Sequence, residues 1–354
     1  MRYLLWIVLI FLLAIRFVYF YKTQRSYPNG TKVRITDRIS SEPIRYEKSQ
    51  YLKLHGLKIY LPLYPEITYG DRVVIEGLVE KDKLKEAKLV SVSENENYLY
   101  LFRENIINFY HESLPQPHSA LVAGTVVGSK SDIQQEFWES LKKSGTAHVV
   151  VASGMNVSLV AGFLISILAG IVNRKKALIF SLIGVWVYAI FAGFDAPIIR
   201  AAIMGSIAFS AQELGRLGSS FRALLISAAA MLLINPGWIS DLGFILSFAA
   251  TLSLILFESK VRRYVRFMPS LIKEGFSTSF AAQILIAPIL FFTFGQFNIL
   301  SPFINALVLW TIPYITIIGM IGGVAGLIVP PVGKLILYLT YPLTSWFTAV
   351  IQLF

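Results

Sequence analysis

Long apolar stretches follow one another through the C-terminal part of the chain, and they limit the fold more than any other feature of the sequence. Each approaches the roughly 20 residues that a helix needs to cross a bilayer. Only 15% of the residues are charged, against about 25% in soluble domains. The sequence therefore predicts a polytopic α-helical membrane protein with a transmembrane domain over 146–354. The eight expected spans are 147–172, 177–193, 197–212, 221–235, 241–257, 275–294, 301–328 (broken near Pro313) and 332–352.

Two segments of different character open the chain. Residues 1–21 are apolar but carry bulky aromatics where a signal peptide would need small residues, which predicts a retained transmembrane helix. Residues 22–97 are polar and alternate with a period of two, as in the hairpin expected to turn at His55-Gly56. Further strands are expected at 32–38, 72–79 and 87–93. Several short strands in so short a segment predict a small all-β domain, an OB-like barrel.

The connector at 98–145 is expected to hold two amphipathic helices. In 98–113, Leu99, Phe102, Ile106 and Phe109 recur at helical spacing. This helix is too short and polar to cross a membrane, so it is expected to lie in the membrane interface. A second helix is expected at 132–144, with Gly145 as its stop.

The orientation follows from the basic residues of the loops. The loops near Arg174, Arg216 and Arg262 are basic, whereas the loops between them contain no Lys or Arg. The positive-inside rule places the basic loops in the cytoplasm. Met1 is then cytoplasmic and the β-domain extracytoplasmic, in the cell membrane. The net charge of +11 fits this topology as well as it fits a polyanionic ligand.

Polar side chains inside the apolar spans are the candidates for lining a hydrated path. Ser153 and Asn156 are three residues apart and are expected to share a helix face. Arg200 either pairs with Asp195, the nearest acid in sequence, or faces a path where its planar guanidinium meets phosphate. The alternative for the whole set is helix capping and interhelical hydrogen bonding. The candidates are His148, Ser153, Asn156, Ser158, Asp195, Arg200, Asp241, Ser247, Gln283, Asn298 and Asn305.

Three segments together resemble the ComEC family of competence channels. They are His…Ser-Gly at 148–158, Pro…Arg-Ala-Ala…Met at 197–204 and Gly-Phe…Leu-Ser-Phe-Ala-Ala-Thr at 243–251. The β-domain, with Tyr-Gly-Asp at 69–71, resembles the family's outer domain. The resemblance covers nearly the whole chain. It implies a channel that carries single-stranded DNA across the cytoplasmic membrane during natural transformation.

Several kinds of chemistry have no motif in this sequence. The chain has no cysteine and only four histidines, which form no His-x-His-x-Asp-His cluster. The metallo-β-lactamase-like domain that many family members carry at the C-terminus is therefore expected to be lacking, and no metal site is expected. Gly333-Lys334 is not part of a phosphate-binding loop. We expect a protein that is not an enzyme and binds no cofactor. Its transport is expected to depend on a separate cytoplasmic motor or on a gradient.

On this hypothesis the outer domain holds single-stranded DNA, with basic residues on the backbone and aromatic residues stacking on bases. Separate DNA-receptor proteins and membrane lipids are the other expected partners. Two alternatives stay open: a secondary transporter of a small solute, with a compact site at the membrane midplane, and a membrane scaffold. The DNA-binding candidates are Lys53, Lys58, Tyr51, Tyr60 and Arg72.

Overall fold

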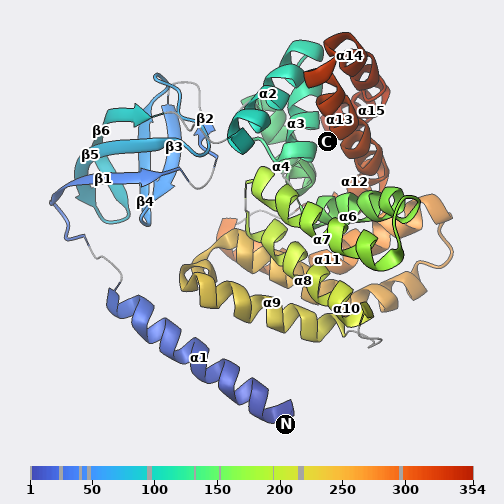
Figure 1. Cartoon of the computed structure of the whole chain (residues 1–354), viewed down its shortest axis with the longest axis horizontal. Helices are drawn as coiled ribbons and strands as arrows, with labels where there is room; N and C mark the ends of the chain where they lie inside the picture. The colour runs from blue at the N-terminus through green and yellow to red at the C-terminus, as the bar shows by residue number, and fades with distance from the viewer. Residues whose placement is uncertain are drawn as a thin grey trace.

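The protein consists of a separate N-terminal helix, a small β-barrel and a large helical bundle (Figure 1). The computed structural model describes residues 2–23, 27–39, 42–45, 49–93, 98–130, 133–150, 153–193, 195–213, 219–294 and 298–353. Helix α1 (Arg2–Thr23) meets the bundle at the C-terminal end of α9, where Arg16 donates hydrogen bonds to the carbonyl oxygens of Leu233 and Ile234. The rest of its apolar surface is exposed, as expected for a helix that faces lipid.

The β-barrel is one six-stranded sheet in the order β1-β5-β6-β4-β3-β2. The pair β4–β6 is parallel and the other pairs are antiparallel. The two edge strands, β1 and β2, come from one continuous segment, so the sheet curls into the partly open barrel of an OB-like fold. The strands are β1 (Lys32–Arg38), β2 (Ile44–Arg45), β3 (Ser49–Leu54), β4 (Leu57–Pro62), β5 (Arg72–Glu80) and β6 (Lys83–Ser93).

The alternation of apolar residues builds the barrel core. On β3 and β4, Leu52, Leu54, Leu57, Ile59 and Leu61 all point inward and are at most 5% exposed. The hairpin turn at His55-Gly56 is confirmed, and both residues adopt positive φ angles. The expected strands are confirmed within a few residues, whereas the two-residue strand β2 was not predicted.

The short helix α3 (His118–Val127) lies at the centre of one half of the bundle. All ten of its residues are buried, and the sequence analysis did not predict it. It packs against α13 and α2. Helix α13 carries glycines on this face, so the ring of Tyr110 from α2 lies directly against Gly323 of α13. This half of the bundle is made of α2 (Tyr98–Ser113), α3, α4 (Gln135–Ser144), α5 (Ala147–Val150), α12 (Ser301–Val308), η2 (Leu309–Thr311), α13 (Ile312–Ile328), α14 (Pro330–Tyr338) and α15 (Tyr341–Gln352).

The other half of the bundle contains the helices that carry the three motif segments. Two small cores join them, one among α6, α7 and α8 and one among α8, α9 and α10. Helix α8 belongs to both cores and is therefore the central helix of this half. The elements are α6 (Gly154–Ala169), α7 (Arg174–Phe191), α8 (Ala196–Glu213), α9 (Ser220–Ile234), η1 (Pro236–Ser240), α10 (Leu242–Tyr264) and α11 (Ser270–Phe294).

The membrane-spanning character is confirmed, but several expected spans differ in form. By length and composition, five apolar helical stretches among the described residues can cross a membrane: Trp6–Thr23, Ala147–Ala169 (with α5 and α6), Leu242–Tyr264, Lys273–Thr293 and Ser301–Ile328 (with α12, η2 and α13). The expected spans at 177–193, 197–212 and 221–235 are α7, α8 and α9, of 18, 18 and 15 residues. The single span expected at 332–352 is wrong. Two helices occupy it, because Pro342 lies in the first turn of α15 and begins a new helix there.

The expected break near Pro313 is confirmed, since η2 separates α12 from α13. The face expected for the 98–113 helix is partly wrong. Leu99 and Phe102 are exposed, whereas Arg103 is buried together with Ile106. Tertiary packing against α3 and α13 selects this face.

Candidate functional site

A pocket of about 210 Å³ lies where the β-barrel meets the helical bundle. Strand β3, the start of α2, the turn after α3 and the loop between α7 and α8 contribute to its wall. Two charged pairs and two tyrosines give it a polar and aromatic lining. The lining residues include Glu42, Tyr51, Lys53, Tyr69, Arg103, Gly128, Lys130, Gly193 and Asp195.

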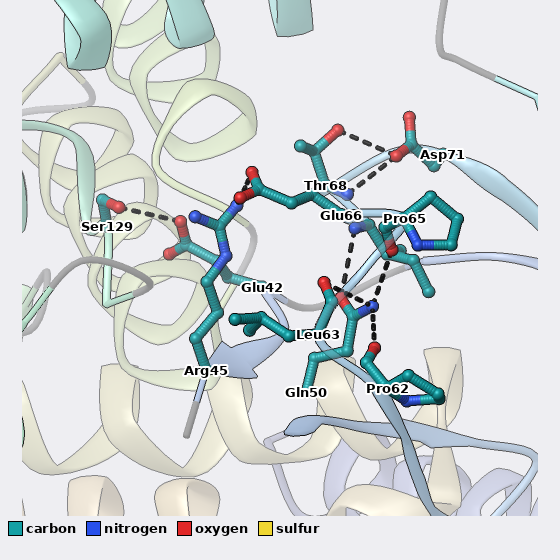
Figure 2. A network of polar contacts seen from close by, with 11 residues as sticks. Glu42, Arg45, Gln50, Pro62, Leu63, Pro65, Glu66, Thr68, Asp71 and Ser129 are labelled. Atoms are coloured by element: carbon teal, nitrogen blue, oxygen red, sulfur yellow. Dashed lines mark hydrogen bonds and ion pairs between the residues drawn. The ribbon is translucent and has the colours of Figure 1, made fainter. Parts of the chain in front are cut away.

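The carboxylate of Glu42 binds three donors from the bundle. The hydroxyl of Ser129 and the backbone N–H of Lys130 each donate to it at 2.8 Å. Arg103 Nη2 lies 3.3 Å from the same carboxylate, and the two side chains are only 8% and 11% exposed. Figure 2 shows Glu42 pointing from the β-domain toward Ser129. This buried ion pair joins the barrel to the helices.

Helix α2 positions Arg103 at the end of α3. The guanidinium also donates to the carbonyl oxygen of Val127 in the last turn of α3, at 3.3 Å, and lies 5.5 Å above the centre of the Tyr69 ring. Its Nε is buried and has no hydrogen-bond partner among the described residues. Arg103 therefore supplies a cation that the carboxylate only partly satisfies.

The loop before β5, which carries Tyr69, is held by two buried polar side chains, Gln50 of β3 and Asp71 (Figure 2). The amide of Gln50 bonds to the backbone at Pro62, Pro65 and Ile67. Asp71, 3% exposed, accepts hydrogen bonds from the backbone N–H and the hydroxyl of Thr68. Burial raises the pKa of the Tyr69 hydroxyl, which keeps it protonated.

Of the two alternatives for Arg200, the pairing with Asp195 is not what the structure has. Asp195 lies 2.8 Å from the ammonium of Lys130, not beside Arg200. The reason is tertiary: the loop between α7 and α8 lies against the turn after α3, which carries Lys130. This second pair is about 30% exposed and lies at the rim of the pocket.

Arg200 lies within the helical bundle, where the three motif segments meet. Its Nη1 donates to the carbonyl oxygen of Ser247 on α10, at 2.9 Å. A Cβ on Gly154, the first residue of α6, would lie 2.6 Å from Nη2 of Arg200, so the glycine makes room for the guanidinium. Arg200 Nε and Ser247 Oγ are buried without a partner in the part of the chain that the structure describes. The site thus presents a cation and a hydroxyl that can bind a further group.

The helix face expected for Ser153 and Asn156 is wrong. Ser153 has extended backbone and is the N-cap of α6, so it is not part of the helix. Asn156 is fully buried and donates to the carbonyl oxygen of Thr125 on α3, at 2.7 Å. Ser158 is exposed and bonds to the carbonyl oxygen of Gly154, one turn back in its own helix. His148 is also exposed, on the short helix α5.

The remaining candidates lie apart from Arg200. Asp241 caps α10 by accepting from the N–H of Phe244, at 2.9 Å. Asn298 donates to the carbonyl oxygen of Lys143, and Asn305 donates to the hydroxyl of Ser279. Gln283 lines an open, largely apolar groove on α11. Asp241, Asn298 and Asn305 thus stabilise a helix cap and contacts between segments, which is the alternative role expected for such polar residues.

Four of the DNA-binding candidates share the outer face of the β3–β4 hairpin. Tyr51 is directly opposite Tyr60 and Lys53 is directly opposite Lys58. The two tyrosine rings are 5.2 Å apart. The hydrogen bond that Lys58 donates to the carboxylate of Asp82 raises the pKa of Lys58, which stays charged. Arg72 lies elsewhere, on β5, which β6 separates from this hairpin.

The sequence analysis missed Glu42, Arg103, Ser129 and Lys130 as functional candidates. Glu42 and Arg103 are 61 residues apart, and only the docking of the barrel brings them together. One signal was available: Arg103 is a lone arginine next to the apolar stripe of an amphipathic helix.

Fold and site together define a multi-pass membrane protein whose small β-barrel is docked over charged groups of its helical bundle. The family model described as Competence protein matches residues 125–354. The chain therefore belongs to the Competence protein family, the ComEC-type membrane proteins. All three motif segments that meet at Arg200 lie within the matched region.

Two curated relatives are similar to this chain. One is ComE operon protein 3 of Bacillus subtilis (strain 168), 32% identical over 241 residues, which cover 67% of this chain and 30% of that protein. The other is Competence protein ComA of Neisseria gonorrhoeae, 27% identical over 220 residues, which cover 58% of this chain and 30% of that protein. The chain thus spans about a third of the length of these relatives. No solved structure matches it.

Proposed function

We propose that the chain forms a conduit for single-stranded DNA across the cytoplasmic membrane during natural transformation, acting as a channel and not as an enzyme. The observation that carries this proposal is the meeting of the three motif segments around Arg200, whose guanidinium has no carboxylate partner among the described residues. A planar guanidinium suits phosphate, because its donors match two phosphate oxygens at once.

The basic and aromatic groups follow one another toward Arg200. The β3–β4 face presents Tyr60 and Lys58, and its neighbours Tyr51 and Lys53 also line the junction pocket. Arg200 follows Asp195 of the pocket rim by five residues along α8, a rise of about 7.5 Å. A strand held by its phosphates and stacked on tyrosines can move through such a series without sequence preference.

We place the β-domain outside the membrane and Met1 in the cytoplasm, with a separate motor and separate DNA-receptor proteins as partners. Support comes from the alternation of basic loops. The chain has no cysteine of its own, so Lys58→Cys and Arg262→Cys variants report one position each. An impermeant external thiol reagent should label the first in intact cells and spare the second. Labelling of the second would overturn this orientation.

The conduit is tested by Arg200→Ala and Arg200→Lys, with membrane abundance and uptake of labelled DNA measured side by side. We expect near-normal abundance in both variants, strongly reduced uptake in Arg200→Ala and partial uptake in Arg200→Lys. Lysine keeps the charge but lacks the planar fork of donors. Normal uptake in Arg200→Ala at normal abundance would contradict the proposal, and so would normal uptake in a strain that lacks the gene.

A further inference from the structure

We propose that Glu42 occupies an anion site that a backbone phosphate of the DNA takes over during uptake. The inference rests on the proposed function and adds a regulated step to it. In the structure the barrel itself fills the site with its own carboxylate. An arriving phosphate exchanges with that carboxylate and releases the barrel from the end of α3.

The donors of this site belong to the bundle, whereas the anion belongs to the barrel. The Ser129 hydroxyl, the Lys130 N–H and Arg103 all converge on the Glu42 carboxylate. A hydroxyl, a backbone N–H and a guanidinium are also the donors that proteins use for phosphate. The site therefore recognises an oxyanion and does not depend on the rest of the glutamate side chain.

Because Arg103 is buried, exchange of the Glu42 carboxylate for a phosphate is more favourable than release of the carboxylate alone. Arg103 is 7% exposed, and removal of Glu42 alone would leave its charge buried and unpaired. A phosphate that enters as the carboxylate leaves keeps Arg103 paired throughout. The buried Nε of Arg103, which has no partner among the described residues, gives a phosphate one more donor than the carboxylate uses.

The pocket beside this site fits a single strand. Its volume of about 210 Å³ is below the roughly 300 Å³ at which sites for drug-sized ligands begin, so it suits part of a nucleotide, such as a base or a phosphate, and not folded nucleic acid. Tyr51 and Lys53 line it on the barrel side, where a base can stack and a neighbouring phosphate can find a cation. The Lys130–Asp195 pair closes the opposite rim.

The test measures binding of a fluorescent oligothymidylate to the purified full chain in detergent. Glu42→Gln removes the competing charge but keeps the size of the side chain. We expect it to bind the oligonucleotide about tenfold more tightly than the unmodified chain does, the change that one charged hydrogen-bond competitor accounts for. The matched control is Glu66→Gln, the same change on the same domain. Glu66 pairs with Arg45 at 3.1 Å and does not line the pocket, so this variant should bind like the unmodified chain.

Two further variants keep the test decisive if Glu42→Gln unfolds. Glu42→Asp retains the charge on a shorter side chain and should bind with intermediate affinity. Ser129→Ala removes a donor that carboxylate and phosphate would share, and should weaken oligonucleotide binding. Melting curves report which variants are folded. Equal affinity of the folded Glu42 variants and the Glu66 control would overturn the exchange, and so would unchanged binding by Ser129→Ala.

The same measurements separate this inference from the proposed function. If the Glu42 variants bind like the control while uptake still requires Arg200, the exchange is wrong and the conduit stands. If Glu42→Gln binds more tightly but uptake is normal without the gene, the anion site stands and the conduit is wrong.

Discussion

Two regions of the molecule bury an arginine, and they give it different bonding partners. One is Arg103 at the junction of barrel and bundle, and the other is Arg200 within the bundle. Arg103 is held by the carboxylate of Glu42, by a carbonyl oxygen at the end of α3 and by the face of Tyr69. Arg200 has the carbonyl oxygen of Ser247 as its bonding partner, and no carboxylate among the described residues pairs with it. The first cation is thus paired with a carboxylate in the structure, whereas the second is bonded to a neutral carbonyl group.

This contrast separates two roles that a basic residue can play along one route. A neutralised cation has to give up its partner before it can bind DNA, so it can control access. A buried cation without a carboxylate partner binds a phosphate without exchange, and the attraction is large because little water screens it. On the proposed function, Arg103 would control access at the junction and Arg200 would guide the strand within the bundle.

The largest effect is expected from Arg103→Ala. This change leaves Glu42 buried without its cation, and breaking a buried pair in this way costs about 3–5 kcal/mol. Arg200→Ala leaves no buried carboxylate without its cation, so the loss of folding stability should be clearly smaller. Thermal melting in detergent compares the two variants, and equal losses would remove the distinction. Adding Glu42→Gln to Arg103→Ala should restore part of the stability, because the stranded charge is then gone.

A middle-sized effect, on uptake and not on folding, is expected from Gly154→Ala. The new Cβ would lie 2.6 Å from Nη2 of Arg200 and has to displace the guanidinium. The flexible side chain can yield, so abundance should hold while DNA uptake falls about tenfold, as for a loss of about 1.4 kcal/mol. Gly162→Ala on the same helix is the matched control, since nothing lies within 4 Å of its Cβ. Equal uptake by the two variants would show that the position of Arg200 is not critical.

The smallest effect is expected from Asp195→Asn at the pocket rim. The pair with Lys130 is partly exposed, and such pairs contribute at most about 1 kcal/mol. The melting temperature should therefore fall slightly, far less than for Arg103→Ala. Glu274→Gln, whose pair with Arg262 is more than half exposed, should show no measurable shift. A loss in Asp195→Asn as large as that in Arg103→Ala would mean that burial does not distinguish the two pairs.

Local patterns predicted the barrel well, because strand alternation and the His55-Gly56 turn depend on neighbours in sequence. The same reasoning singled out Arg200 as the basic residue without company inside the spans. It could not find α3, since its ten mostly apolar residues carry no helical stripe and are too short to be read as a span. Packing against α13 and α2 is what makes this segment a buried helix.

Partners distant in sequence were beyond such reasoning. Asp195 was one of two alternatives for Arg200 because it is near in sequence, but in the fold it pairs with Lys130. Glu42 lies in a short segment before a two-residue strand, and no periodicity marks it as buried. In both cases the contact exists only because the barrel and the loop between α7 and α8 meet the same turn after α3.

The segment between β1 and β2 has a mechanical consequence. Its two strands form the opposite edges of the sheet, and Glu42 lies between them. The seam of the barrel and its anchor to the bundle are therefore one piece of chain. A force that pulls the barrel away from the helices acts through Glu42 directly on the two edge strands, and strain at the seam acts back on the anchor. The barrel is thus attached to the bundle at the segment that joins its two edge strands. Opening of the barrel and its release from the bundle are therefore expected to strain the same few residues.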